Sequence, residues 1–380
     1  HLSITAVFEP AGEECGTRYD ESNACPHVFA PVMDLSDYYP GVSLGPDLCG
    51  AGRVQVGDLV LDLTCVPRAK DIARTIANEW IVFQRLADLL GTASGMTINV
   101  KPLFDSGTVP VITGFYGIEK EGRPLTFGRG GSDYSAAIVA NALDADMLEI
   151  WTDVDGFMSA DPRIIPDAVK VDEMNFGEAA ELAYFGAKVL HPRTVEPARA
   201  KSITIKVKNV FKPDYEGTAI NPKGVEGRKT IKSISSMPNM AMLKVYGSGL
   251  GSKSGVMSEI SVLLSEAGIN IYSAATSQTC LSLLIEEKEL KHAEKALSDA
   301  KRGVVDRFET VRDVALLCLV GEGLGQKVGI AGRVFAIVAK TGTNIGLISA
   351  GASTVALTFT VKRKDLEVTT KTIHQEFFGG

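Results

Sequence analysis

The sequence lacks the features that would place a protein in a membrane or on a nucleic acid. No apolar run approaches the roughly 20 residues that a membrane-spanning helix needs, and the N-terminus shows no basic stretch followed by an apolar one. Runs rich in Lys and Arg are also missing, and the 380 residues carry a formal net charge of −7. We therefore expect a cytoplasmic protein without a membrane or nucleic-acid partner. The chain begins with His1, which leaves room for lost upstream residues.

Closely spaced cysteines are lacking as well. The six cysteines are Cys15, Cys25, Cys49, Cys65, Cys280 and Cys318. They are widely separated. The sequence contains no C-x-x-C pair, the cysteine spacing that is typical of zinc sites. We therefore expect buried or surface thiols in an intracellular protein, and no zinc site.

A glycine-rich loop, GRGGSD at residues 128–133, precedes a predicted helix. Its glycines are Gly128, Gly130 and Gly131. Glycine permits positive φ and lets amide N–H groups approach an anion, while the guanidinium of Arg129 suits a carboxylate or phosphate. Ser132 or Asp133 is expected to cap a helix over residues 134–143, whose N-terminal dipole favours negative charge. Taken alone, the loop is equally consistent with a plain turn.

Polar residues follow the next apolar segment. The run MLEIW at residues 147–151 is predicted to form a buried strand, and Thr152, Asp153 and Asp155 follow it in the turn before Gly156. Ligands bind at the carboxyl ends of parallel strands in α/β folds. Together with the glycine-rich loop, this turn indicates a site for a nucleotide phosphate and an acidic substrate.

Three regions of the chain differ in pattern. Pro, Gly and Asp recur in residues 1–100, where only residues 69–90 show a helical pattern. Short apolar strands then alternate with helices, including a predicted helix over residues 174–190. That alternation predicts an α/β fold with a mainly parallel sheet that is flanked by helices on both faces. The charged, Gly-rich segment 221–229 is expected to link two domains.

An internal repeat follows this linker. Shifting the sequence by 74 residues aligns GSGLGSKSG at residues 247–255 with GEGLGQKVG at residues 321–329, and Asn270-Ile271 with Asn344-Ile345. Each copy predicts a βαββαβ unit that buries one face of its sheet, and such units tend to associate side by side. In the first copy, one helix face is expected to consist of Val256, Ile260, Leu263, Leu264 and Ala267.

Three motifs together resemble those of aspartate kinases in the amino-acid kinase family. They are GRGGSD, WTDVDGFMSADPR at residues 151–163 and FGAKVLHPRT at residues 185–194, in the family's order and spacing. The resemblance covers roughly residues 100–377, and the repeat resembles the tandem ACT domains, of ferredoxin-like fold, in that family. It implies a kinase domain over residues 1–225 with an atypical lobe over 1–100, one ACT domain over 226–310 and a second over 311–380.

The resemblance implies phosphorylation of the β-carboxylate of L-aspartate to 4-phospho-L-aspartate by ATP and Mg²⁺, with the carboxylate attacking the γ-phosphorus. It implies that Arg129 is catalytic and binds the substrate carboxylate together with Ser132, and that Asp133, also catalytic, holds Mg²⁺. The residues that it implies for ATP binding are Gly130, Gly131, Thr152, Asp153, Arg163 and Lys188. Met158 stands where the family often has Tyr, which bears on the contact to adenine.

Two family motifs are missing. The sequence has neither the Lys-Phe-Gly-Gly-Thr loop, whose lysine bridges the transferred phosphoryl group, nor the Ser-Phe-Gly-Glu stretch for the amino acid. Residues 1–100 contain a single lysine, Lys70, and loss of such a cation costs about 10³-fold or more in rate. Either the N-terminal part is missing or wrongly represented, or the lobe has been replaced. The alternatives to an active aspartate kinase are a weakly active or inactive amino-acid-sensing regulatory subunit, and a kinase for another amino acid such as glutamate.

The ACT resemblance also implies feedback control by an end product, lysine or threonine, between which the sequence does not choose. The expected effector contacts are Ser254, Gly255, Val256, Asn270, Ile271, Thr276 and Ser277. Amide N–H groups in the turn before the helix suit the effector carboxylate, and Asn270-Ile271 presents backbone groups to its ammonium. The second copy has Ala350-Gly351 in place of Thr276-Ser277, and is expected to serve as a partner surface in a homodimer formed through the ACT domains.

Overall fold

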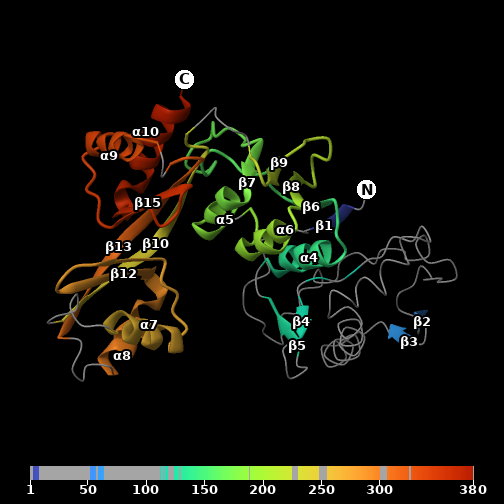
Figure 1. The fold of residues 1–380 in the computed structure, drawn as a ribbon, viewed down its shortest axis with the longest axis horizontal. Coiled ribbons are helices and arrows are strands. Elements are labelled where there is room, and N and C mark those ends of the chain that lie inside the picture. The colour runs from blue at the N-terminus through green and yellow to red at the C-terminus, as the bar shows by residue number, and fades with distance from the viewer. Residues whose placement is uncertain are drawn as a thin grey trace. The chain divides into compact units, whose positions relative to one another are not determined.

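The chain divides into two compact units in the computed structural model (Figure 1). The first unit comprises His1–Asp155 and Arg193–Pro222, and the second comprises Gly156–Pro192 and Lys223–Gly380. The residues whose structure is described are 3–7, 52–56, 59–63, 112, 114, 116–118, 124–127, 130–187, 189–224, 230–247, 255–299, 306–324 and 327–379. The division after Asp155 comes earlier in the chain than the predicted linker at 221–229, because residues 156–192 pack with the C-terminal unit.

The first unit contains a mainly parallel sheet, which confirms the prediction. Strands β1 (Ser3–Val7), β6 (Met147–Thr152) and β8 (Thr204–Asn209) run parallel to one another in that order. Strand β9 (Thr218–Asn221) pairs antiparallel with β8. Two antiparallel hairpins, β2 (Gly52–Val56) with β3 (Leu59–Leu63) and β4 (Tyr116–Ile118) with β5 (Pro124–Thr126), precede β6 in the chain. The helix expected over residues 69–90 lies outside the described residues.

Strand β6 is buried on one face. Leu148 and Ile150 are 0% and 1% exposed. The predicted strand is present, and its burial is confined to this face, because Glu149 and Trp151 on the other face are half-buried. The ammonium of Lys208 on β8 lies 4.4 Å from the centre of the Trp151 ring, so this face carries a cation–π contact in place of an apolar layer.

Helix α4 (Gly131–Ala142) contacts β1 and β6 and packs against α6 (Val195–Ala200). The expectation that Ser132 or Asp133 caps this helix is wrong. The helix begins earlier, its N-cap residue is Gly130, and no side chain caps it. Gly130 has a φ of 76°, a conformation that glycine adopts at little cost, so the glycine-rich loop leads directly into the first turn.

The second unit contains a six-stranded sheet in the order β11-β12-β10-β13-β15-β14, paired antiparallel throughout. Its strands are β10 (Ser233–Tyr246), β11 (Ser273–Thr276), β12 (Cys280–Glu286), β13 (Arg307–Val320), β14 (Ile348–Ala350) and β15 (Ala356–Lys362). Its helices are α7 (Val256–Glu266), α8 (Leu290–Asp299), α9 (Ile330–Lys340) and α10 (Leu366–Phe378), with 3₁₀ turns η3 (Glu287–Glu289) and η4 (Arg363–Asp365). The order of these elements repeats as strand, helix, strand, strand, helix from β10 to α8 and again from β13 to α10, which confirms the predicted tandem of similar α/β units.

The two halves of this sheet share their longest strands, β10 and β13. The first hydrophobic core includes Leu243, Val256, Ile260 and Leu283. The second core includes Leu317, Val334, Phe359 and Ile373. Phe308, near the start of β13, packs against the first core, whereas Ile234, near the start of β10, belongs to the second. Each long strand therefore begins in one core and ends in the other, an exchange that the repeat does not predict.

The pairing of β10 with β13 is irregular where the strands pass from one core to the other. Register shifts occur between Met237 and Met240 and between Met240 and Met242. Asp313 at the same place in β13 has a φ of 57°. Bulges of this kind bend and twist a strand pair, so the sheet bends between its two halves.

The segment before this sheet contributes β7 (Glu173–Asn175) and α5 (Phe176–Tyr184), which contacts β13. The helix expected over residues 174–190 is wrong at both ends: α5 starts at a capping box between Asn175 and Glu178 and ends at Tyr184. The short turn η2 (Pro192–Thr194) leads on to α6.

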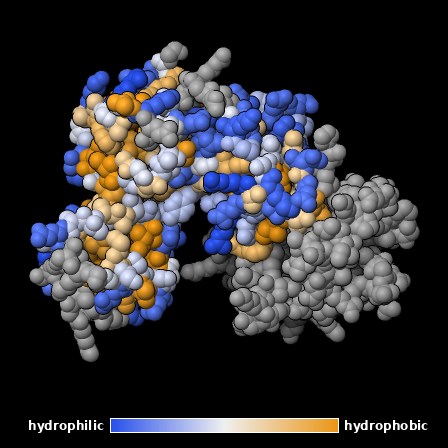
Figure 2. Space-filling model, viewed as in Figure 1, coloured by the Kyte–Doolittle hydropathy of each residue, from blue (hydrophilic) through white to orange (hydrophobic). Residues whose placement is uncertain are grey.

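Two cysteines fall within the described residues, and both are free. Cys318 is 0% exposed and burial raises the pKa of its thiol well above the usual value, whereas Cys280 is half-buried. Hydrophobic residues reach the visible surface of the second unit (orange in Figure 2), and the exposed ones there include Val262, Val328 and Ile348. Over the described stretches, no helix combines the length and the apolar character needed to cross a membrane.

Candidate functional site

Polar side chains gather at the carboxyl ends of β6 and β8 in the first unit. The hydroxyl of Thr152 donates to Oδ1 of Asp153 at 3.2 Å. Beyond it, Asp155 Oδ1 accepts from Nδ2 of Asn209 at 2.5 Å, and Asp155 Oδ2 lies 2.8 Å from Nζ of Lys212. Thr152 and Asn209 are buried at 8% and 5% exposure, while Asp153 is exposed. One edge of the sheet therefore carries the buried hydroxyl of Thr152, the exposed carboxylate of Asp153 and the ammonium of Lys212.

The N-terminus of α4 reaches the same edge. Four residues connect α4 to β6, and the two elements pack together, so the helix runs antiparallel to the strand. A 12-residue helix is roughly 18 Å long and a six-residue strand roughly 20 Å, so the start of α4 lies level with the end of β6. This arrangement places Gly130, Gly131, Ser132 and Asp133 on the same edge of the sheet as Thr152 and Asp153.

The first turn of α4 is suited to an anion. Its leading amide N–H groups have no partner within the helix, and its dipole favours negative charge. Ser132 and Asp133 are both half-buried in this turn. Asp133 and Asp153 supply carboxylate oxygens, the ligands that Mg²⁺ prefers, so the donor set of this edge fits that cation. Gly128 and Arg129 lie outside the described residues.

Asn209 and Lys212 are the residues of this edge that the sequence interpretation missed. Both contact Asp155, which the sequence places in the turn after β6. A signal was present, because Asn209 ends the alternating segment TIKVKN of β8 and therefore shares the carboxyl edge with Thr152.

Arg163 lies in the second unit, where it forms a forked pair with Asp161. Its Nε lies 3.0 Å from Oδ1 and its Nη2 2.6 Å from Oδ2 of that carboxylate. The hydrogen bonds to Asp161 raise the pKa of Arg163 further above its usual value, and the side chain is 79% exposed. Arg163 must exchange or share this carboxylate in order to bind a phosphate.

The segment that leads to Lys188 is anchored to the six-stranded sheet of the second unit. Lys188 itself lies outside the described residues. Gly186, two residues earlier, has a φ of 107°, and a Cβ at this position would lie 2.5 Å from the carbonyl oxygen of Ser236 on β10. At the other end of α5, Glu178 forms an ion pair of 2.8 Å with Lys232, and the two side chains are 0% and 10% exposed. These contacts fix α5 at its start and just beyond its end.

The expected effector residues fall into two groups. Gly255 caps α7 and Val256 begins it, while Thr276 ends β11 and Ser277 follows that strand. Asn270 and Ile271 follow the other end of α7, roughly 16 Å away for an 11-residue helix. Ser254 lies outside the described residues. One chain therefore does not gather all these residues around one small ligand.

Asn270 is connected to α5 through two tyrosines. Its Nδ2 donates to the hydroxyl of Tyr184 at 3.1 Å, and the ring of Tyr184 lies 5.4 Å from that of Tyr272. Burial and the hydrogen bond from Tyr272 to Glu286 raise the pKa of Tyr272 to about 12, so this phenol stays neutral and donates at physiological pH. The expected effector site and the helix before Lys188 are therefore in direct contact within the second unit.

Residues 93–209 match the amino acid kinase family, and residues 235–299 and 317–377 each match an ACT domain. A relative from Haemophilus influenzae, a bifunctional aspartokinase/homoserine dehydrogenase, is 33% identical over 277 residues, which are 71% of this chain and 34% of the relative. The chain thus spans about a third of the length of that curated relative.

Two solved structures of Escherichia coli aspartokinase III are similar to the chain. The complex with aspartate and ADP, in the R-state, has a TM-score of 0.67 at 31% identity, covering 76% of this chain and 65% of that one. The complex with lysine and aspartate, in the T-state, has a TM-score of 0.63 at 31% identity, covering 76% and 64%.

Proposed function

This chain is a homologue of aspartokinases that carries an amino acid kinase family domain followed by two ACT domains, and from that premise we propose that it phosphorylates the β-carboxylate of L-aspartate with ATP. The observation that carries the proposal is the shared edge at which the first turn of α4 meets the carboxyl end of β6. That edge combines a helix N-terminus for an anion with carboxylates for a cation.

The chemistry asks the chain to position two anions. A carboxylate oxygen of aspartate attacks the γ-phosphorus, the bond from that phosphorus to the bridging oxygen breaks, and ADP leaves. Ser132 and Arg129 orient the substrate carboxylate, while the amides of Gly130 and Gly131 approach phosphate oxygens. Asp133 would hold Mg²⁺, and the bound cation would neutralise charge on the phosphates. Thr152, Asp153, Arg163 and Lys188 contact the nucleotide.

A coupled assay of ADP formation tests this proposal. We expect turnover with L-aspartate and Mg²⁺-ATP, and none with L-glutamate in place of aspartate. The second candidate function is an amino-acid-sensing regulatory subunit, which the two ACT-domain matches favour. Binding of lysine or threonine without any aspartate-dependent ADP formation would establish that candidate and exclude the kinase.

We expect Arg129→Ala to weaken the use of aspartate more than that of ATP. Loss of a charge-assisted hydrogen bond costs about 1.5–3 kcal/mol, which lowers kcat/KM for aspartate by roughly 10- to 150-fold. Steady-state kinetics with each substrate varied in turn measure the effect. Arg193→Ala, an exposed arginine of the same unit, serves as the control. Unchanged aspartate kinetics in Arg129→Ala would remove this residue from the site.

We further propose that the effector is lysine and that two chains complete its site. Lysine is bound in one of the similar aspartokinase III structures. Strand β11 is an edge strand with exposed side chains, and antiparallel pairing with the same strand of a second chain would place the start of one beside the end of the other. Asn270 of one chain would then approach the turn before α7 of its partner.

Replacing Asn270 with alanine is expected to weaken lysine binding. The loss of one hydrogen-bonding group costs about 0.5–1.5 kcal/mol, which corresponds to roughly a 2- to 12-fold rise in the dissociation constant measured by calorimetry. Asn344→Ala changes the matching residue of the second repeat and should bind lysine like the unmodified protein. Equal losses in the two variants, or none in Asn270→Ala, would misplace the effector site.

A further inference from the structure

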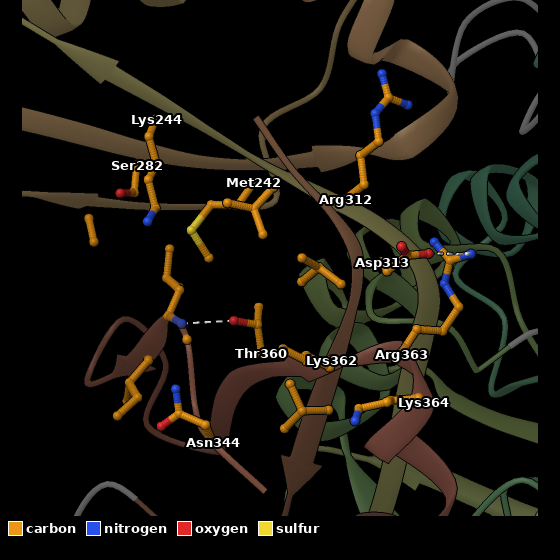
Figure 3. Close-up of a pocket in the computed structure, with 17 residues that line it drawn as sticks. Met242, Lys244, Ser282, Arg312, Asp313, Asn344, Thr360, Lys362, Arg363 and Lys364 are labelled. Carbon is orange, nitrogen blue, oxygen red and sulfur yellow. Dashed lines mark hydrogen bonds and ion pairs between the residues drawn. The ribbon is translucent and has the colours of Figure 1, made fainter. Parts of the chain in front are cut away.

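A hollow of about 990 Å³ lies on the six-stranded sheet of the second unit, on the face opposite helices α7 to α10 (Figure 3). Leu243 on β10 and Phe359 on β15 point into the two hydrophobic cores beneath the helices. Their strand neighbours Met242, Lys244 and Thr360 line the hollow, as alternation along a strand requires. The hollow sits where the sheet bends, so residues from both halves surround it.

Cationic side chains dominate the charge of this hollow. They are Lys244, Arg312, Lys362, Arg363 and Lys364, and the lining contains one acidic residue, Asp313. Arg363 pairs with Glu287 and, at 3.7 Å, with Asp313. The other four cations form no ion pair with any described residue. The chain as a whole is acidic at −7, so this is a local concentration of positive charge.

Glu309 stands opposite Lys244 in the pairing of β10 with β13. The carboxylate of Glu309 accepts a hydrogen bond from Tyr246 at 3.1 Å and lies 4.0 Å from Arg307. Glu309 is therefore held by other partners, and the ammonium of Lys244 extends toward the open space in Figure 3. Arg312 points away from the middle of the hollow in the same view, so Lys244 and Lys364 are the better candidates for direct contact.

The floor of the hollow is apolar and its polar atoms are already used. Met242, Val314 and Leu347 are 7%, 6% and 4% exposed. The hydroxyl of Thr360 accepts from the amide of Leu347 at 2.7 Å. A buried exception is Nε of Arg363, which has no hydrogen-bond partner among the described residues. The hollow thus offers an apolar surface with a cationic rim.

We propose that this hollow binds a small organic phosphate, with its apolar group on the floor and its phosphate between Lys244 and Lys364. Clefts of roughly 300–1,000 Å³ with an apolar lining and a few convergent polar groups are typical of small-molecule sites. Several unpaired cations around one space favour a doubly charged anion, because each adds to the local potential. The lining of the hollow contains none of the expected effector residues, and the proposal does not depend on the kinase proposal.

Calorimetric titrations of the full chain with phenyl phosphate, inorganic phosphate and phenol separate the contribution of the apolar floor from that of the cationic rim. We expect phenyl phosphate to bind more tightly than inorganic phosphate, phenol to bind least, and phenyl phosphate binding to weaken as salt screens the cations. The double variant Lys244→Gln/Lys364→Gln should lose at least tenfold in affinity for phenyl phosphate. The control Lys291→Gln/Lys340→Gln removes two lysines from α8 and α9 and should stay within twofold.

Three results would overturn the proposal. They are equal affinity of the hollow variant and the unmodified protein, equal losses in the hollow and control variants, and binding of an acidic peptide in the hollow without binding of phenyl phosphate. The last result would assign the surface to a protein partner. Circular dichroism of the two double variants shows whether they fold alike, and ADP formation, measured in parallel, reports on the kinase proposal separately.

Discussion

Lys232→Met is expected to lower the free energy of unfolding of the second unit by about 3–5 kcal/mol, the usual cost of removing one partner from a buried ion pair. Lys232 is 10% exposed and its ammonium lies 2.8 Å from Oε2 of Glu178, which is fully buried. The other oxygen, Oε1, has no hydrogen-bond partner among the described residues. The substitution leaves a carboxylate in the interior with only the amide of Asn175 to stabilise it.

Urea unfolding followed by circular dichroism measures this loss, and hydrogen exchange in residues 230–247 locates it. Lys371→Met is the matched control, since Lys371 pairs with Glu367 one helical turn away and the two side chains are 51% and 67% exposed. Exposed pairs of this type contribute about 0.3–0.5 kcal/mol. If Lys232→Met and Lys371→Met lower the free energy of unfolding equally, the buried ion pair stabilises the fold no more than the exposed one.

Gly186→Ala is expected to disturb the segment that carries Lys188. A Cβ at this residue would lie 2.5 Å from a backbone oxygen of β10, and the φ of 107° is unfavourable for alanine. Either the segment or the strand must move. If Lys188 contacts the nucleotide, we expect kcat/KM for ATP to fall at least tenfold, because a displaced cation no longer meets the phosphate.

Gly268→Ala is the control that separates the effect of backbone strain from that of the steric clash expected in Gly186→Ala. Gly268 has a φ of 71°, and no described atom lies within 4 Å of the position of its missing Cβ. Its substitution should cost about 1–2 kcal/mol of stability and leave ATP kinetics unchanged. Normal ATP kinetics in Gly186→Ala, with an intact fold, would show that this glycine does not position the nucleotide site.

Local patterns predicted the parts of the fold that local physics determines. Apolar spacing predicted the helix face of α7, where Val256, Ile260 and Leu264 are buried. Ala267 was expected on that face but is exposed, because it follows the last turn of the helix. The start of α4 was also predicted at the wrong residue. The backbone freedom of Gly130 outweighed the capping preference of the residues after it.

Contacts between distant segments could not be read from the sequence. The partner of Glu178 is 54 positions away, and nothing in the letters around Lys232 marks it as buried. The exchange of strands between the two cores is hidden for a different reason. β10 and β13 are each one continuous strand of 14 residues, so the sequence does not show which core either half joins. The candidate site was predictable only in part. Its place at one edge of the sheet follows from where the strands end, whereas the contacts of Asp155 with Asn209 and Lys212 are visible only in the structure.

Because β10 and β13 each contribute to both cores, the two repeats fold as one unit and must be inherited as one. Ser233 at the start of β10 pairs with Val320 at the end of β13, across 87 positions of the chain. A fragment cut between the repeats would leave Ile234 without the second core and Phe308 or its neighbours without the first. Recombination between relatives therefore preserves this region only when both repeats are inherited together. Because such long-range pairing must form before either core closes, the pair should fold slowly and as one cooperative block.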